Sequence, residues 1–158
     1  MKIRRYQDSD KSRIIELLRL NTPQHFSPKE EKDLLYYLNH QIEHYSVIEV
    51  DELIIGCGGF NLWVNGEGAS ISWDIVHPHY QGKGLGSDLT KFRIQKIKEI
   101  ERIKSITVRT SQFAYAFYER FGFEVKETAT DYWDIGFDLY KMERNINLIS
   151  EDSPEGSR

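Results

Sequence analysis

A glycine-rich loop between an apolar strand and an amphipathic helix constrains this chain more than any other segment of its sequence. The β-branched run ends at Val76, a proline turn follows, and residues 81–87 then read QGKGLGS. Glycines at alternate positions let the backbone approach a ligand closely, because no side chain stands in the way. The N–H groups at the start of a helix favour anions, since the helix dipole is positive there. The loop therefore predicts a phosphate or pyrophosphate site.

Two common phosphate loops do not fit this segment. A nucleotide-triphosphate loop has its lysine after the last glycine, whereas Lys83 lies between glycines and Ser87 follows Gly86. A dinucleotide loop reads Gly-x-Gly-x-x-Gly near the start of a βαβ unit, whereas this loop reads Gly-x-Gly-x-Gly in mid-chain. The pattern that remains is Gln/Arg-x-x-Gly-x-Gly/Ala, which Gln81, Gly84 and Gly86 meet in full.

The composition is that of one globular domain. The chain has 158 residues, of which 39% are hydrophobic and 13% aromatic, so we expect one domain over residues 1–144 and a polar, frayed tail over 145–158. A formal net charge of −4 argues against a general nucleic-acid binder. We expect no membrane span, because no long apolar run occurs, and no signal peptide. The single cysteine, Cys57, is expected to be a core residue and is consistent with a reducing cytoplasm.

The apolar periodicity predicts an order of β-α-α-β-β-β-α-β-α-β-β. Strands are expected over residues 2–6, 47–50, 53–63, 69–76, 105–110, 123–126 and 132–142. We expect Asp8 or Ser9 to cap the first helix, and Asn21-Thr22-Pro23 to end it. The second helix begins at a capping box that reads Ser27-Pro28-Lys29-Glu30. Its expected buried stripe is Leu34, Leu35, Leu38 and Ile42.

The third helix follows the glycine loop and has one irregularity. Its expected apolar face consists of Leu85, Leu89, Phe92, Ile100 and Ile103. Ile94 falls off that stripe. The basic residues are expected on a solvated face, interleaved with acids: Lys91, Arg93, Lys96, Lys98, Glu99 and Glu101. Before this helix, His77 and His79 are expected to bind no metal, because no third ligand is positioned with them.

A second motif occupies residues 111–123, which read SQFAYAFYERFGF. It follows the pattern Asn-x-x-Ala-x-x-(aliphatic or aromatic)-Tyr-Glu-x-x-Gly-Phe, with Ser111 where asparagine is usual. The matching positions are Ala114, Tyr118, Glu119, Gly122 and Phe123. Together with the glycine loop and the order of elements, this motif resembles the GNAT superfamily of acyl-CoA-dependent N-acetyltransferases from end to end. The resemblance implies an α/β (α+β) mixed sheet that is splayed between its fourth and fifth strands, and acetyl-CoA as co-substrate.

The resemblance also implies roles for individual residues. The pyrophosphate would be held by Gln81, Gly82, Lys83, Gly84, Leu85, Gly86 and Ser87. Ile75 and Val76 would flank the acyl carbonyl and pantetheine, with the Val76 N–H as oxyanion donor. Thr110 and Ser111 would flank the pantetheine or the reacting centre. Tyr118 stands at the position of the general acid, and a hydroxyl with a pKa of about 10 suits protonation of a departing thiolate with a pKa of about 8.5.

The general base stays open among three candidates. Asp74 lies two residues before Val76, in a mostly apolar strand where a carboxylate is either paired or functional. Glu67 stands at the start of the same strand. Water that relays the proton to bulk solvent is the third candidate.

The predicted reaction is transfer of an acetyl group from acetyl-CoA to a primary amine of a small molecule or peptide. The resemblance implies an acceptor pocket between residues 21–26 and 128–133, where Phe26, Tyr132 and Trp133 offer aromatic surface. Asp131 and Asp134 could attract a cationic acceptor. The alternatives are a non-catalytic acyl-CoA-binding or regulatory module and a nucleotide-binding enzyme that uses the loop for ATP. A homodimer is compatible with the sequence; nucleic acid and membrane are not expected partners.

Overall fold

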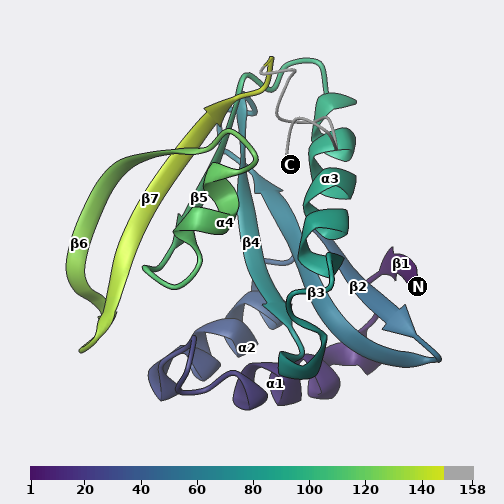
Figure 1. Ribbon diagram of the computed structural model, residues 1–158. Coiled ribbons are helices and arrows are strands. Elements are labelled where there is room, and N and C mark those ends of the chain that lie inside the picture. The colour runs from purple at the N-terminus through teal and green to yellow at the C-terminus, as the bar shows by residue number, and fades with distance from the viewer. Residues whose placement is uncertain (148–158) are drawn as a thin grey trace. The chain divides into compact units, whose positions relative to one another are not determined.

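The computed structural model describes residues 1–147 and contains the predicted order of helices and strands (Figure 1). The strands are β1 (Lys2–Arg5), β2 (His44–Val50), β3 (Leu53–Leu62), β4 (Gly68–Val76), β5 (Ser105–Thr110), β6 (Glu124–Asp134) and β7 (Phe137–Asn145). The helices are α1 (Lys11–Leu20), α2 (Glu31–His40), α3 (Leu85–Lys98) and α4 (Tyr115–Glu119). The hydrogen-bonded strand order is β1-β2-β3-β4-β5-β7-β6, with β4 and β5 parallel. The predicted mixed α/β fold is confirmed.

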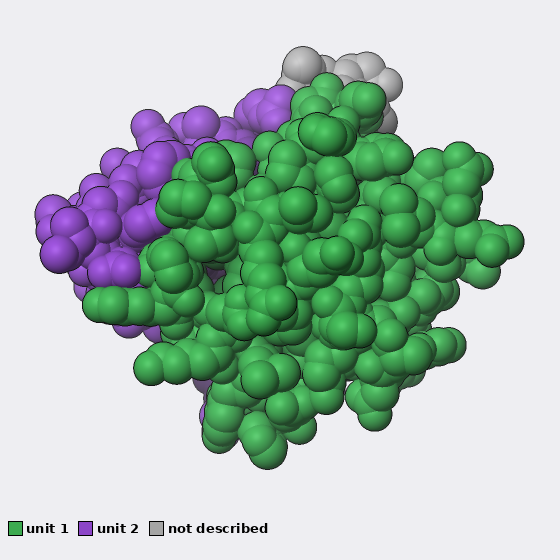
Figure 2. Space-filling model, turned by 90° about the horizontal axis from the view of Figure 1, so that it is seen from below, with its two compact units in different colours: residues 1–61, 72–93 green, residues 62–71, 94–158 purple. Residues whose placement is uncertain are grey.

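The chain forms two compact units, which Figure 2 distinguishes by colour. Unit 1 comprises residues 1–61 and 72–93, and unit 2 comprises residues 62–71 and the chain from residue 94 onward. Three elements contribute to both units, because β3, β4 and α3 each cross a boundary.

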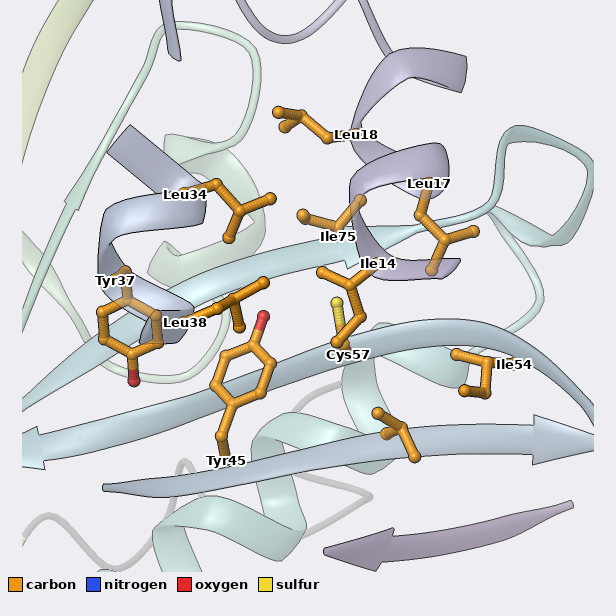
Figure 3. Packing of buried hydrophobic residues seen from close by; sticks show 11 residues of the cluster. Ile14, Leu17, Leu18, Leu34, Tyr37, Leu38, Tyr45, Ile54, Cys57 and Ile75 are labelled. Carbon is orange, nitrogen blue, oxygen red and sulfur yellow. The ribbon is translucent and has the colours of Figure 1, made fainter. Parts of the chain in front are cut away.

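The core of unit 1 follows the alternation of side chains along β2 and β3. Val47 packs into a cluster with α1 and α2, whereas its neighbour Ile48 packs with Ile55 and the first turns of α3. In Figure 3 the side chains of Ile14 on α1 and of Leu34 and Leu38 on α2 lie around Cys57 and Ile75 on the strands. The sheet of unit 1 therefore has a helix-covered core on each face.

The starts of α1 and α2 are fixed by carboxylates. At α1 the predicted caps Asp8 and Ser9 are wrong: the Asp10 carboxylate accepts the backbone N–H of Gln7 at 2.8 Å, and it also accepts two bonds from Arg4 at 2.9 Å. At α2 the predicted capping box is confirmed. The Ser27 hydroxyl accepts the Lys29 N–H at 3.1 Å, and the Glu30 carboxylate accepts the Ser27 N–H at 2.8 Å.

Two predicted helix faces differ from the structure. In α2, Leu35 is exposed and Tyr37 is buried in its place, because Leu34, Tyr37 and Leu38 share the inner face. In α3 the buried residues are Leu89, which the predicted stripe included, and a set at i, i+3, i+4 and i+7 that consists of Thr90, Arg93, Ile94 and Ile97. The predicted stripe omitted this face because it contains an arginine, and the predicted solvated position of Arg93 is wrong.

Unit 2 is built on the β5–β7–β6 ladder with α4 packed against it. β5 pairs antiparallel with β7 from Ser105 opposite Asn145 to Thr110 opposite Tyr140, and the Tyr115 ring of α4 stacks on Tyr140 at 4.4 Å between ring centres. The parallel pairing of β4 with β5 comprises three residue pairs, which end at Ser70 opposite Thr107. The splay that the sequence predicts beyond these pairs stays a prediction.

The last hairpin is displaced from its predicted position. β6 continues to Asp134, so Tyr132 and Trp133 lie at the end of β6 and not at the start of β7. The turn is made by Gly136, which has a φ of 85°, and by Asp131, whose φ is 55° and whose carboxylate accepts the Gly136 N–H at 2.8 Å. Aromatic residues favour strands on either side of such a turn, so only the glycine marked it in the sequence.

The described chain ends shortly after β7. This strand runs to Asn145, and Ile146 is buried with its N–H donated to the Lys104 carbonyl at 2.9 Å. The fold therefore continues past residue 144, and residues 148–158 of the frayed tail predicted over 145–158 lie outside the described residues. Within residues 1–147 no helix has the length and apolarity that crossing a bilayer requires.

Candidate functional site

The glycine loop has the backbone that a close approach to an anion requires. Gly82 and Gly84 have φ values of 78° and 85°, and a Cβ placed on either would meet no atom within 4 Å. The first helical bond of α3 runs from the Asp88 N–H to the Gly84 carbonyl at 2.9 Å. The N–H groups of residues 85–87 precede this bond, so the helix itself does not use them. This arrangement can accept an anion from the solvent side.

The Gln81 side chain binds the protein itself. Its amide donates to the Asn21 side-chain oxygen at 2.9 Å and to the Val76 carbonyl at 3.0 Å. Asn21 is buried at the end of α1, and its own amide donates to the Leu17 and Val76 carbonyls at 2.9 and 3.1 Å. Gln81 thus holds the loop against the end of β4. The sequence assigned Asn21 to a helix stop and to the edge of the acceptor pocket, and it missed this contact.

The end of β4 carries a strained residue. Trp73 has a φ of 47°, which is rare for a bulky side chain inside a strand. The Tyr45 hydroxyl donates to the Trp73 carbonyl at 2.7 Å, and the Trp73 ring stacks on Phe26 at 6.3 Å between centres. The buried Tyr45 therefore supports the backbone just before Ile75 and Val76, and no sequence pattern indicated this role.

Asp74 is paired with a buried arginine. The Arg93 guanidinium donates from Nη1 to Oδ1 and, at 2.7 Å, from Nη2 to Oδ2, so both carboxylate oxygens accept. The Arg93 side chain is 2% exposed and the Asp74 side chain 20%. Arg93 also donates to the Gly59 carbonyl and to the Thr90 hydroxyl, each at 3.2 Å. This pair explains a charged residue in an apolar strand, and the role of Asp74 as a base stays a prediction.

Glu67 lies in the turn that precedes β4, at the end of the strand opposite to Val76. Its carboxylate lies 3.2 Å from the Lys104 ammonium, and its carbonyl accepts the Lys104 N–H at 2.8 Å. Both contacts fasten the turn to the start of β5. They assign Glu67 a structural contact, and its role as a base stays a prediction.

The second motif begins and ends α4. The Ser111 hydroxyl accepts the Phe113 N–H at 3.2 Å and its carbonyl accepts the Tyr115 N–H at 3.1 Å, so serine serves as a side-chain acceptor where asparagine is usual. Gly122, with a φ of 85°, ends the helix region. Tyr118 is buried at 5% exposure, with its ring edge-on to Phe117. The acid role of Tyr118 stays a prediction.

The end of β5 is tied to the last hairpin. The Trp133 indole N–H donates to the Thr110 carbonyl at 3.2 Å. The Gln112 amide donates to the Gly136 carbonyl at 2.8 Å and accepts the Asp138 N–H at 2.9 Å. These contacts fix the segment that links β5 to α4, from which the second motif starts.

Two further side chains bear on the chemistry. Burial raises the pKa of the Cys57 thiol to about 12, so it is protonated and unreactive at neutral pH. Burial lowers the pKa of His77, whose Nδ1 accepts the His79 N–H at 3.1 Å. Across residues 1–147 no group of three or more His, Cys, Asp and Glu is arranged to hold a metal ion.

Comparison with known proteins gives consistent matches. A model of the acetyltransferase (GNAT) family matches residues 12–123, which include both motifs and parts of both units. A Bacillus subtilis protein provisionally named a ribosomal protein bS18-alanine N-acetyltransferase is 32% identical over 128 residues, or 77% of this chain and 83% of that protein.

Longer relatives and solved structures match as well. The amino-acid acetyltransferase of Pasteurella multocida is 30% identical over 141 residues, which are 89% of this chain and 31% of that protein. The chain thus spans about a third of the length of this relative. The structure of an aminoglycoside 6'-N-acetyltransferase complexed with coenzyme A has a TM-score of 0.73 at 14% identity, over 92% of this chain and 97% of that one.

Proposed function

This chain belongs to the acetyltransferase (GNAT) family, and from that premise we propose that it transfers an acetyl group from acetyl-CoA to a primary amine. The observation that carries the proposal is the glycine loop, where Gly82 and Gly84 open the backbone in front of the first N–H groups of α3. The relatives named after an amino acid and after a ribosomal-protein alanine support an amine on a small molecule or a peptide as acceptor.

The loop and the end of β4 would bind the co-substrate. The N–H groups of Leu85, Gly86 and Ser87 would hold the pyrophosphate, with Gln81 as the anchor of the loop. The Lys83 ammonium lies 5.5 Å above the Tyr80 ring and would add positive charge at the rim. The neighbour complexed with coenzyme A supports acetyl-CoA as the donor.

The reaction would be a direct attack on the thioester. The amine nitrogen bonds to the carbonyl carbon, the C–S bond breaks, and the electron pair leaves on sulfur. The Val76 N–H would stabilise the charge on the carbonyl oxygen, with Ile75 beside it. Tyr118 would give its hydroxyl proton to the departing thiolate, and Ser111 would place the segment before α4.

The proton of the amine needs an acceptor. Asp74 stays the proposed base. Water is the alternative, because both Asp74 oxygens already accept hydrogen bonds from Arg93. Glu67 is the weakest of the three candidates, since it stands at the other end of β4 in contact with Lys104.

A cytoplasmic location is supported by the single buried cysteine, which needs no oxidising compartment. A homodimer stays a prediction that sedimentation of the purified protein tests.

The deciding experiment measures release of free thiol from acetyl-CoA with a panel of amines. We expect Tyr118→Phe to lower kcat at least tenfold and to change acetyl-CoA affinity little, because the hydroxyl proton is lost and the aromatic ring stays. Tyr115→Phe, on the same helix, is the matched control and should keep kcat. Equal turnover in Tyr118→Phe and the wild type would remove the acid role.

The same measurements separate the alternatives. Acetyl-CoA binding without transfer to any amine would favour the non-catalytic acyl-CoA module. Thermal stabilisation by ATP that acetyl-CoA does not compete away would favour a nucleotide-binding enzyme.

A further inference from the structure

Arg109, near the end of β5, is held by two aromatic rings of the last hairpin. Its guanidinium carbon lies 5.1 Å from the centre of the Tyr132 ring and 5.8 Å from the centre of the Trp133 ring. Its Nη2 donates to the Tyr132 hydroxyl. The two rings meet edge to face, 5.0 Å apart at 87°. An arginine in this setting has few rotamers left, although its side chain is exposed to solvent.

The rings themselves are anchored. The indole of Trp133 donates to the carbonyl of Thr110, the residue next to Arg109. Gln112 ties the same segment to Gly136 in the hairpin turn. The guanidinium is therefore held in place by contacts within unit 2, immediately before the segment 110–111 and the start of α4.

The positive charge of Arg109 lacks a carboxylate partner. Among the described residues no ion pair involves Arg109, whereas Arg4, Arg19 and Arg93 are each paired with an acid. On β7 the residue directly opposite Arg109 is Lys141, a second cation on the same face of the ladder. Like charges in opposite positions destabilise a sheet, so this pair costs stability.

The contacts of the nearby acids are with groups other than Arg109. The Lys141 ammonium lies 4.0 Å from the Glu127 carboxylate. Asp131 and Asp138 accept backbone N–H groups of the turn at 2.8 and 2.9 Å, so they hold the hairpin. A guanidinium has five N–H donors, of which Tyr132 accepts one, and the planar fork matches both oxygens of a carboxylate.

We propose that Arg109 binds a carboxylate of the acyl acceptor, so that the acceptor is an amine that also carries a carboxylate, such as a free amino acid. Tyr132 and Trp133 act as positioning residues, because they hold the guanidinium for a bidentate contact. The proposal rests on the proposed acetyl transfer. It opposes the expectation that Asp131 and Asp134 attract a cationic acceptor.

The test compares acceptors that differ only in the carboxylate. Acetyl transfer is measured for a free amino acid and its carboxamide, and for a peptide with glutamate or glutamine after its N-terminal residue. We expect the wild type to favour a carboxylate acceptor, and Arg109→Gln to raise KM for that acceptor roughly ten- to a hundredfold. The carboxamide and the affinity for acetyl-CoA should change little. The comparison in which Arg109→Gln reduces the preference, free amino acids or peptides, tells which of the two carries the bound carboxylate.

Two variants control for charge and folding. Arg102→Gln removes the same charge from an exposed arginine just before the other end of β5, and it should leave the preference unchanged. Arg109→Lys keeps the charge without the planar fork, and it should lose part of the preference. Thermal unfolding checks that each variant is folded.

The outcomes are separable. A wild type that acetylates acid and amide alike, or an Arg109→Gln variant that loses both equally, overturns the carboxylate site and leaves the proposed transfer standing. A wild type that consumes no acetyl-CoA with any amine overturns the transfer and, with it, the acceptor site.

Discussion

At the scale of single residues, Asp74 and Arg93 account together for two irregularities of the sequence and for one departure of the structure from its predictions. A carboxylate interrupts an apolar strand, a basic residue faces the core from a helix, and Ile94 falls off the expected stripe. The structure explains all three, because the Arg93 guanidinium donates to both oxygens of Asp74. The face of α3 that carries Arg93 and Ile94 is therefore turned toward the core. Gly58 makes room for the pair, since a Cβ there would overlap both side chains.

Asp74→Asn should lower the free energy of unfolding by about 3 kcal/mol, because it leaves the charge of the nearly inaccessible Arg93 without its carboxylate. Urea denaturation at pH 7 measures the loss. Glu31→Gln is the control: it breaks the exposed pair with Arg19, which solvent screens, and should cost much less stability. A cost for Asp74→Asn no larger than the control's would show that the pair does not stabilise the fold.

A double variant separates stability from catalysis. Asp74→Leu with Arg93→Met removes both charges and should recover most of the lost stability, since an apolar pair of similar volume often replaces a buried ion pair. If Asp74 is the base, the folded double variant still lacks turnover at neutral pH and regains it as pH rises. A double variant that turns over like the wild type would assign proton removal to water.

At the scale of elements, local signals predicted the order of helices and strands and some of their boundaries. The capping box placed α2, and the Asp51-Glu52 turn adopts φ values of 52° and 65°, as a two-residue hairpin turn requires. The last hairpin was displaced, because Tyr132 and Trp133 suit a strand on either side of a turn.

The candidate site likewise combines local motifs with contacts between distant parts of the chain. The glycine loop and the second motif are local, so the sequence predicted them. The contact of Gln81 with Asn21 spans 60 residues, and that of Tyr45 with Trp73 spans 28. Such contacts depend on which elements pack together, and no local pattern carries that information.

Gly84→Ala should weaken acetyl-CoA binding at least tenfold, because its Cβ would fill the space in which the loop faces solvent. Gly136→Ala is closely matched: both glycines have a φ of 85° and open space in front, so both variants pay about 1–2 kcal/mol of backbone strain. Calorimetric titration of acetyl-CoA measures the difference. Equal loss of affinity in both variants would assign the effect to strain, and unchanged affinity in Gly84→Ala would contradict the loop as the pyrophosphate site.

At the scale of the whole molecule, four acids of unit 1 have a raised pKa. Burial raises the pKa of Tyr37 to about 12, that of Cys57 to about 12, and those of Tyr6 and Tyr45 above their ordinary values. In unit 2, burial and the charge of Arg144 lower the pKa of Lys98. The first four groups release protons more readily in the unfolded chain, whereas Lys98 retains its proton longer there.

These pKa shifts together predict that the fold loses stability at alkaline pH. Each raised group contributes stability that is fully present below its unfolded pKa, about 8.5 for cysteine and 10 for tyrosine, and that is lost as pH rises toward the folded value. The free energy of unfolding falls by about 1.4 kcal/mol per pH unit for each group that titrates fully. Lys98 opposes this fall with one proton. The free energy of unfolding should therefore fall from pH 8.5 to pH 11.

Urea denaturation at pH 7.5, 9 and 10.5 tests this balance on neighbouring tyrosines of α2. Tyr37→Phe should flatten the decline by about 1 kcal/mol, because the buried phenol no longer ionises on unfolding. It should also lower stability at pH 7.5, since the hydroxyl donates to Asn61 at 2.7 Å. Tyr36→Phe, at a side chain that is 57% exposed, should keep the wild-type decline. Parallel curves for both variants would show that burial of Tyr37 does not set the alkaline limit of the fold.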